Sequence, residues 1–258
     1  MIKLLHQLLS TFSLVSRIPV VLRDKPDFSR SSLFLPPIGL LAGLSALAGA
    51  WLGLLLFGPG MLAALSSIIV QYAAFNLFHF DGLLDTADAS GVHGSQEKRR
   101  AVLKDSRIGV FAFFAGFMVL AARLAVLTQL SQAAAVWLWI VLLLAPVAGR
   151  LAGVLAAASG EPAPGSSLAT MIGRLSPRQA AVGYGIAVIP AFLLITIHFG
   201  IPAGMALVLA GGIAATLSGL LLSLWYRRKI GGYNGDAIGA AIEGGELLVL
   251  LLAALILR

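Results

Sequence analysis

The sequence lacks cysteine altogether and contains few charged residues. The missing cysteine excludes disulfide bonds and cysteine-ligated metal sites. Charged residues make up 11% of the 258-residue chain, whereas soluble domains contain about a quarter, and 59% of the chain is hydrophobic. So little polar surface excludes an ordinary soluble domain. The composition predicts a membrane protein that forms a single domain over residues 1–258.

The balance of charge is basic, with 18 Lys and Arg against 11 Asp and Glu and a net charge of +7. In a soluble protein this excess would favour a nucleic-acid partner. In a membrane protein it is the usual composition of cytoplasmic loops, which collect Lys and Arg. We therefore expect no nucleic-acid partner, and we expect the basic face to attract anionic substrates.

Apolar runs of about 20 residues, the length that crosses a bilayer, recur along the chain. We predict seven transmembrane helices, at 33–57, 61–80, 108–130, 133–158, 179–199, 203–226 and 237–257. In the preceding residues 1–30, apolar side chains repeat with helical spacing between polar ones, which predicts an amphipathic helix at the membrane interface. The predicted fold class is an all-α integral membrane protein with about seven transmembrane helices plus this N-terminal helix.

The Lys and Arg residues are distributed unevenly between the predicted loops. They gather before residue 33, in the 81–107 loop, in the 159–178 loop and just after residue 226, which all fall on one side of a seven-helix arrangement. The turns on the other side carry no charge. By the positive-inside rule the charged side is cytoplasmic. We therefore expect a multi-pass protein of the cytoplasmic (inner) membrane, with its N-terminus and active site on the cytoplasmic side.

Most of the few acidic residues fall into two groups. In the first, in the predicted catalytic loop 81–107, Asp81, Asp85 and Asp88 are spaced i, i+4 and i+7. On a helix they would share a sector of about 60°. Like charges on one face repel one another, and a hard cation such as Mg²⁺ would resolve the repulsion through oxygen ligands and a bridge to phosphate. The alternative is a solvated acidic face that pairs with arginines of the same loop.

The second acidic group lies in a second cytoplasmic motif, 231–246. Asp236 and Glu243 share one helical face with small residues between them, so a ligand could approach the backbone closely there. Just before them, a glycine-rich loop ends in Asn234 and Gly235, and its backbone N–H groups could hold an anion at the start of the helix. The alternative is an ordinary turn with an aspartate cap.

Three further side chains are candidates because of their position. His79 lies two residues before Asp81 and is either a structural residue at the helix end or a donor to the site. Arg123 and Arg150 are intramembrane charges and therefore functional candidates by default. We favour Arg150, which lies nearer the cytoplasmic end of its helix, as a partner of phosphate or carboxylate.

Three longer motifs occur in order along the chain: His79-x-Asp81-Gly-Leu-x-Asp85-Thr-x-Asp88, Lys104-Asp105-Ser106-Arg107-Ile108-Gly109, and Gly231-Gly232-x-x-Gly235-Asp236-x-x-Gly239-Ala240-Ala241-x-Glu243-x-x-Glu246. Two shorter ones precede them: Arg17-Ile-Pro19 and Pro37-Ile-Gly39. Over nearly the whole chain these motifs resemble the cobalamin synthase family, the adenosylcobinamide-GDP ribazoletransferases. Asn234 departs from the family pattern, which more often has Thr there.

The resemblance implies a reaction and its cofactor. The hydroxyl of α-ribazole, or of α-ribazole 5′-phosphate, would attack the cobinamide-linked phosphoryl group of adenosylcobinamide-GDP, and GMP would leave. The product would be adenosylcobalamin or its 5′-phosphate. The family uses Mg²⁺ in the cytoplasmic membrane, so the resemblance implies these two substrates, Mg²⁺ and the lipid bilayer as partners.

Pattern and resemblance together suggest a role for each candidate residue. The predicted Mg²⁺ ligands are four aspartates: Asp81, Asp85, Asp88 and Asp105. These and Asp236 form the predicted catalytic set, in which one carboxylate takes the proton of the attacking hydroxyl. The predicted substrate-binding residues balance phosphate charge or hold the acceptor: His79, Lys104, Arg107, Arg150, Asn234, Gly235, Glu243 and Glu246.

Two other functions are compatible with parts of this pattern. The carboxylate cluster alone predicts only a Mg²⁺-dependent phosphotransferase, as in the membrane CDP-alcohol phosphotransferases. The chain does not match their Asp-Gly-x-x-Ala-Arg pattern, because Asp81-Gly82 is followed by Leu83-Leu84-Asp85-Thr86. A cation-coupled transporter is the non-enzymatic alternative, but its acids would lie at mid-membrane in an inverted repeat, and no such repeat is evident.

Overall fold

The computed structural model describes residues 2–133, 135–158 and 160–256, and within these ranges its regular elements are helices without strands. In chain order they are α1 (Ile2–Val15), α2 (Ser31–Phe57), α3 (Met61–Gln71), the π-helix η1 (Tyr72–Asn76), α4 (Leu77–Gly91), α5 (Gln96–Val102), α6 (Val110–Gln132), α7 (Ala135–Ala158), α8 (Ser167–Ile172), α9 (Pro177–Ala187), α10 (Ile189–Phe199), α11 (Ile201–Lys229) and α12 (Gly235–Ile256).

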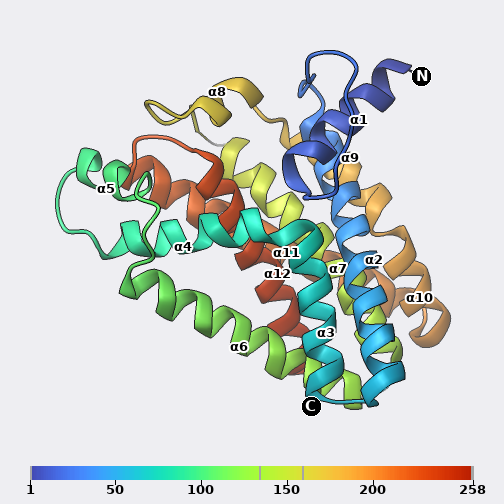
Figure 1. The fold of residues 1–258 in the computed structure, drawn as a ribbon. Coiled ribbons are helices and arrows are strands. Elements are labelled where there is room, and N and C mark those ends of the chain that lie inside the picture. Colours follow the sequence, from blue (N-terminus) through green and yellow to red (C-terminus); the bar gives the residue numbers. More distant parts are fainter. Residues whose placement is uncertain (1, 134, 159, 257–258) are drawn as a thin grey trace.

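Six helical segments in the described chain are long and apolar enough to cross a membrane: α2, the continuous segment from α3 to α4, α6, α7, α11 and α12. A seventh span arises if α9 and α10, which meet at a bend of 45°, are counted together. The prediction of an all-α integral membrane protein with about seven spans and a short N-terminal helix is therefore confirmed. Figure 1 shows α1, α5 and α8 at one end of the bundle, and the turn between α2 and α3 at the other.

The central helix of the bundle is α7, which is almost entirely buried and packs against α2, α11 and α12. Glycines permit the closest of these approaches. A side-chain carbon on Gly39 of α2 would lie 2.8 Å from Cα of Val147, and one on Gly149 of α7 would lie 2.8 Å from the carbonyl oxygen of Ile242. Because only small residues allow helix backbones this close, α2, α7 and α12 form a tightly packed core.

The outer helices carry large apolar side chains that the bundle leaves exposed, among them Trp51, Phe113, Phe117 and Leu221. In a soluble protein an apolar surface this extensive would cause aggregation. Around a transmembrane bundle it is the surface that lipid tails cover, which agrees with the composition.

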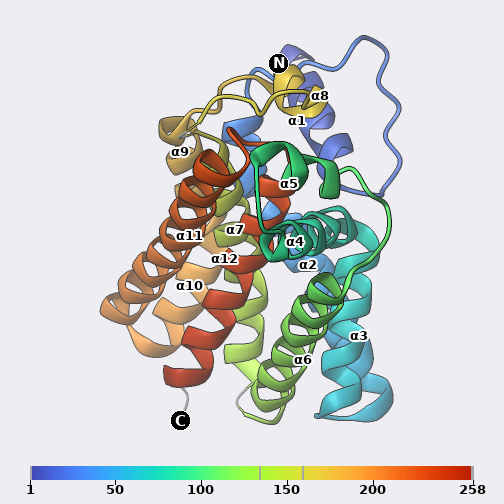
Figure 2. The same ribbon diagram turned by 90° about the vertical axis from the view of Figure 1, so that its left-hand side faces the viewer.

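The chain changes direction at η1, between α3 and α4. Figure 1 shows α4 running across the direction of α2 and α3, and Figure 2, turned by 90°, shows α4 nearly end-on. The segment expected to end at residue 80 thus continues as helix to Gly91 and carries the first acidic group along α4. An extra residue in a helical turn, as in a π-helix, is a common feature of functional sites. Here the turn brings α4 against α6 and α12.

Candidate active site

The first acidic group meets Asp236 of the second group where α4 crosses α12. A side-chain carbon on Gly82 would lie 2.8 Å from Cα of Asp236, and one on Gly239 would lie 3.0 Å from Cα of His79. Each helix therefore presents a glycine to the backbone of the other. This contact brings Asp236, at the start of α12, beside the aspartates of α4.

The aspartates at this crossing form a group of like charges. The carboxylate of Asp85 is repelled by Asp236, Asp81 and Asp88. Within the described residues, no hydrogen bond engages the side chain of Asp81 or Asp85. Their oxygens are therefore available to a ligand, and a cation is the species that would relieve the repulsion.

Asp88, the last aspartate of the group, attaches α4 to the start of α6. Its two carboxylate oxygens accept hydrogen bonds from the backbone nitrogens of Gly109 at 2.7 Å and Ala112 at 2.9 Å. These N–H groups belong to the first turn of a helix, where they lack intrahelical partners and favour an anion. Asp88 therefore caps α6 in this structure.

Asp105 lies in the loop before α6 and is paired with Arg107. The guanidinium of Arg107 donates to the carboxylate through Nη2 at 2.6 Å and through Nε at 3.0 and 3.1 Å, and its backbone nitrogen donates at 3.1 Å. Hydrogen bonds from the side chain and then the backbone of Arg107 lower the pKa of Asp105 to about 2. Asp105 is therefore ionised throughout the physiological pH range.

Two of the cavities that border the aspartates contain charged side chains from several motifs. The acidic cavity, about 250 Å³, lies between α4 and the loop before α6 and is lined by these residues among others: Asp81, Asp85, Asp88, Lys104, Asp105, Arg107. The loop cavity, about 240 Å³, lies between α5 and the start of α12 and is lined by these residues among others: Arg100, Lys104, Ser166, Ser167, Asn234, Gly235, Asp236. Lys104 lines both, so its ammonium group is available to an anion in either.

The loop from residue 160 to 166 reaches the site through backbone pairing. The backbone nitrogen of Ala163 donates to Tyr233 at 2.7 Å, and that of Tyr233 donates to Glu161 at 3.0 Å. This pairing brings Ser166 and Ser167 into the loop cavity. The sequence pattern gave no role to these serines, since a Pro/Gly/Ser-rich composition indicates a loop but not its neighbour.

The loop before α12 orients Asp236. The side-chain nitrogen of Asn234 donates to the carboxylate of Asp236 at 2.6 Å, while its side-chain oxygen accepts from the backbone nitrogen of Ala237 at 3.0 Å. Asn234 therefore acts as an N-cap and holds Asp236 toward the loop cavity. The alternative that we predicted was an ordinary turn with an aspartate cap. The cap is Asn234, and Asp236 is the residue that Asn234 positions.

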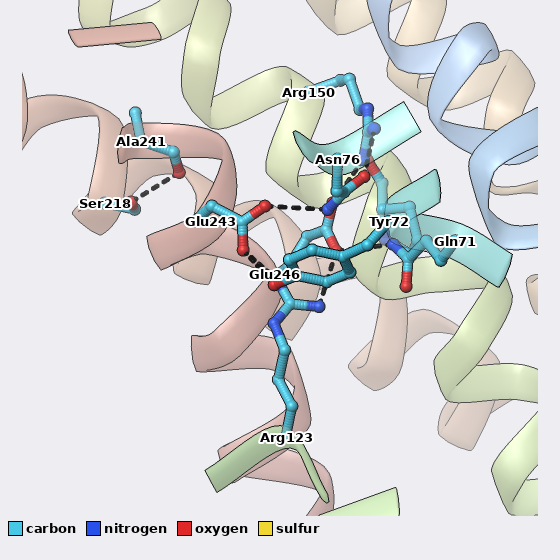
Figure 3. A network of polar contacts seen from close by, with 10 residues as sticks. Gln71, Tyr72, Asn76, Arg123, Arg150, Ser218, Ala241, Glu243 and Glu246 are labelled. Atoms are coloured by element: carbon cyan, nitrogen blue, oxygen red, sulfur yellow. Dashed lines mark hydrogen bonds and ion pairs between the residues drawn. The ribbon is translucent and has the colours of Figure 1, made fainter. Parts of the chain in front are cut away.

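The remaining candidates lie deeper, in a buried ion network that joins α12 to α6 and α7 (Figure 3). Arg123 donates to Glu243 at 2.9 Å and to Glu246 at 3.0 Å. Arg150 pairs with Glu246 from the other side. The four side chains are at most 2% exposed. Two carboxylates and two guanidinium groups therefore balance one another inside the bundle.

The network also includes the polar side chains around η1. Glu243 accepts hydrogen bonds from the hydroxyl of Tyr72 at 2.7 Å and from Asn76 at 2.9 Å. Glu246 accepts from Gln71 at 2.9 Å and again from Asn76 at 3.1 Å. We had not predicted a role for Gln71, Tyr72 or Asn76, although polar side chains inside an apolar segment are a signal that could have found them.

The predicted site residues are therefore divided between two places. Those on α4, on the loop before α6 and in the loop before α12 surround the two cavities, and His79 packs beside the crossing of α4 and α12. Arg150, Glu243 and Glu246 lie in the ion network, together with Arg123, which we had ranked below Arg150. Their proposed contact with substrate stays a prediction.

Comparison with known proteins identifies the family of this chain. A family model described as cobalamin-5-phosphate synthase matches residues 7–254. The chain belongs to this family. Similar relatives include proteins named adenosylcobinamide-GDP ribazoletransferase from Fervidobacterium nodosum, 29% identical over 96% of both chains, and from Shigella flexneri, 32% identical over 93% of this chain and 95% of the relative. No solved structure matches this member of the cobalamin-5-phosphate synthase family.

The ion network predicts a large loss of stability when one of its cations is removed. Arg123→Met leaves Glu243 and Glu246 with one guanidinium between them, and we expect it to lower the free energy of unfolding by about 3–5 kcal/mol. Unfolding in mixed micelles, followed by circular dichroism, measures this change. The matched control is Arg174→Met, which breaks the exposed 3.0 Å pair with Glu161 and should cost about 1 kcal/mol or less. Equal effects of the two substitutions would contradict the prediction.

The crossing of α4 and α12 predicts that Gly82 cannot carry a side chain. The Cβ of Gly82→Ala would meet the backbone of Asp236, so the helices would have to move apart at a cost of about 1–3 kcal/mol. Gly185→Ala in α9 is the control, because a side-chain carbon there meets nothing within 4 Å. Thermal unfolding in detergent should separate the two variants. Unchanged stability of Gly82→Ala would show that the contact is looser than this structure has it.

Proposed function

We propose that this protein joins α-ribazole, or its 5′-phosphate, to adenosylcobinamide-GDP and releases GMP. The observation that carries the proposal is the meeting of the three motifs: the aspartates of α4, the 104–109 loop and the start of α12 border two cavities that share Lys104. Membership of the cobalamin-5-phosphate synthase family and the names of the relatives support the substrate pair.

In the proposed reaction, a hydroxyl oxygen of the acceptor forms a bond to the cobinamide-linked phosphorus, and the bond from that phosphorus to the departing GMP breaks. The hydroxyl proton passes to a carboxylate. Asp81 and Asp85 are the best candidates for this base, because their oxygens are free of hydrogen bonds within the described structure. Phosphoryl transfer depends chiefly on positioning and charge stabilisation. The neighbouring carboxylates and Lys104, which lines both cavities, can supply these.

We further propose that the carboxylates hold Mg²⁺. No group of three or more acidic or histidine side chains converges on one point in the described chain. Mg²⁺ is commonly bound by one or two carboxylates together with substrate phosphates and water, so this arrangement suits it. Asp81 and Asp85 are the expected ligands, since Asp88 and Asp105 are already engaged. When bound, the ion would neutralise charge on the phosphates.

Lys104 and the serines of the loop cavity are proposed to act on the substrate phosphates. Lys104 is exposed and its ammonium nitrogen would lie 3.5 Å from a side-chain carbon placed on Gly165, so it stands between the two loops that border the cavity. A mobile ammonium group there can follow the charge of the phosphates. Ser166 and Ser167 offer hydroxyl donors to the same anion.

We propose that the site faces the cytoplasm from the inner membrane. Segments rich in Lys and Arg are close in sequence to motifs that border the cavities. The helix α5 lies between the first two motifs, and the end of α11 directly precedes the third. Such segments are retained on the cytoplasmic side. Nucleotide-linked substrates carry several negative charges, and a basic surface would attract them.

A turnover assay tests the proposal directly. The purified protein, in detergent or liposomes, should form product from adenosylcobinamide-GDP and α-ribazole 5′-phosphate, and chelation of divalent cations should abolish the reaction. The same preparation should give no product when a CDP-alcohol replaces the donor. Turnover of the CDP-alcohol in preference to the cobinamide donor would overturn the assignment.

Asp81→Asn tests the role of the acidic group. The amide keeps the shape of the side chain but neither binds Mg²⁺ well nor takes a proton, so we expect turnover to fall by about a hundredfold or more. Asp24→Asn, at an exposed position before α2, is the control and should keep wild-type turnover. Size-exclusion profiles check that both variants fold. Near-normal turnover of Asp81→Asn would remove this residue from the catalytic set.

A further inference from the structure

A third cavity lies beside α1 and shares Asp236 with the loop cavity. Its volume is about 160 Å³, and its walls come from α1, α2, α4, α8 and the start of α12. Most of the lining side chains are apolar, including Leu14, Leu35, Phe78 and Ile172. We call it the apolar cavity. A whole drug-sized ligand needs about 300 Å³ or more, so this space suits a group of one or two rings.

Of the polar side chains in these walls, Ser31 is hydrogen-bonded to Thr11 and Asp236 to Asn234, whereas His79 has no partner in the described structure. The residue is 4% exposed, and neither ring nitrogen has a hydrogen-bond partner in the described structure. A buried polar group without a partner carries a cost in folding free energy. An imidazole ring presents a nitrogen on each side, so a ligand with a polar ring edge would give one of these nitrogens a partner.

The apolar cavity shares part of its wall with the proposed active site. Gly235, Asp236 and Leu168 line both the apolar cavity and the loop cavity. A ligand whose ring system lies in the apolar cavity would therefore extend past Asp236 into the loop cavity. There its polar part would meet the serines and the lysine that are proposed to hold phosphate.

We propose that the apolar cavity receives the aromatic base of the acceptor nucleoside, with His79 hydrogen-bonded to a nitrogen on the edge of that base. The inference rests on the proposed transfer to a ribazole-type acceptor and specifies where that acceptor is recognised. The base that fits is a flat, fused heterocycle without polar substituents. His79 is then a specificity-determining residue, distinct from the carboxylates that carry out the transfer.

Two other occupants fit less well. A lipid acyl chain would fill the apolar walls but would leave both nitrogens of His79 without a partner. Guanine, the base of the donor, carries an exocyclic oxygen and amine, and the wall is mostly leucine, isoleucine and phenylalanine, so only Ser31 and Asp236 besides His79 could pair with these groups. In a base such as benzimidazole, one ring nitrogen carries the ribose and the other accepts one hydrogen bond from His79, while the remaining edges are apolar.

The experiment compares steady-state constants for the two substrates in full-length protein. His79→Leu removes the hydrogen bond and Ile172→Phe fills the cavity. Each should raise the KM for α-ribazole about tenfold or more, while the KM for adenosylcobinamide-GDP and the kcat at saturating acceptor stay near wild type. Met171→Phe is the control, because Met171 is the exposed neighbour of Ile172 on α8, and it should change neither KM.

Benzimidazole serves as a direct probe of the cavity. It should inhibit wild-type protein competitively against α-ribazole and raise its melting temperature, and both effects should be lost in His79→Leu. Guanine should do neither. His79→Leu itself should melt no lower than wild type, because it removes an unpaired buried group, so a purely structural role for His79 would be visible as a fall in stability.

The outcomes separate this inference from the proposed function. Absence of product with wild-type protein would overturn the proposed function. Product formation with an unchanged acceptor KM in both variants would overturn only the proposal that the apolar cavity receives the acceptor base. A rise in the KM of the donor instead would do the same. If Ile172→Phe does not fold, His79→Leu and the benzimidazole titration still decide between these results.

Discussion

The buried ion network is the interaction on which the arrangement of the site depends. It holds Glu243 and Glu246 of α12 between guanidinium groups of α6 and α7, where unpaired charge would be very costly. The same carboxylates accept hydrogen bonds from Tyr72 and Asn76, the first and last residues of η1. The π-helical turn is thereby tied to α12. Because α4 begins directly after this turn, the network fixes where α4 starts and, with it, where the aspartates of α4 lie.

From that start, α4 runs across the bundle and meets α12 a second time, where Gly82 and Gly239 admit the opposing backbones. The two contacts hold α4 at one end and in its middle, and the cap that Asp88 provides for α6 holds its far end. Acidic residues far apart in the sequence therefore come together at a surface bordered by loops. The three cavities that border this surface are linked through Lys104 and Asp236.

Much of the fold could be predicted from the sequence, because the length of an apolar run and the periodicity of a helix are local properties. The spans, the N-terminal helix and the common face of Asp81 and Asp85 followed from them. The direction of α4 could not, since η1 is stabilised by partners on α12. The shared helical face of Asp236 and Glu243 suggested that both belong to one site. In the structure, α12 places Asp236 at the loop cavity and Glu243 in the buried ion network. The position of the 160–166 loop depends on backbone pairing with Tyr233, which leaves no mark in the composition.

The chain uses carboxylates in two ways, and their partners explain the difference. Glu243 and Glu246 are surrounded by two guanidinium groups and by hydrogen-bond donors, so their charge is balanced within the protein. Asp81 and Asp85 border an open cavity without a hydrogen bond in the described structure, so their mutual repulsion is unrelieved by the protein itself. An arginine placed among them would relieve it but would also occupy the oxygens that a cation and a phosphate need. The inner pairing holds the bundle together, and the unpaired outer charge is what gives this surface its capacity to bind ligands.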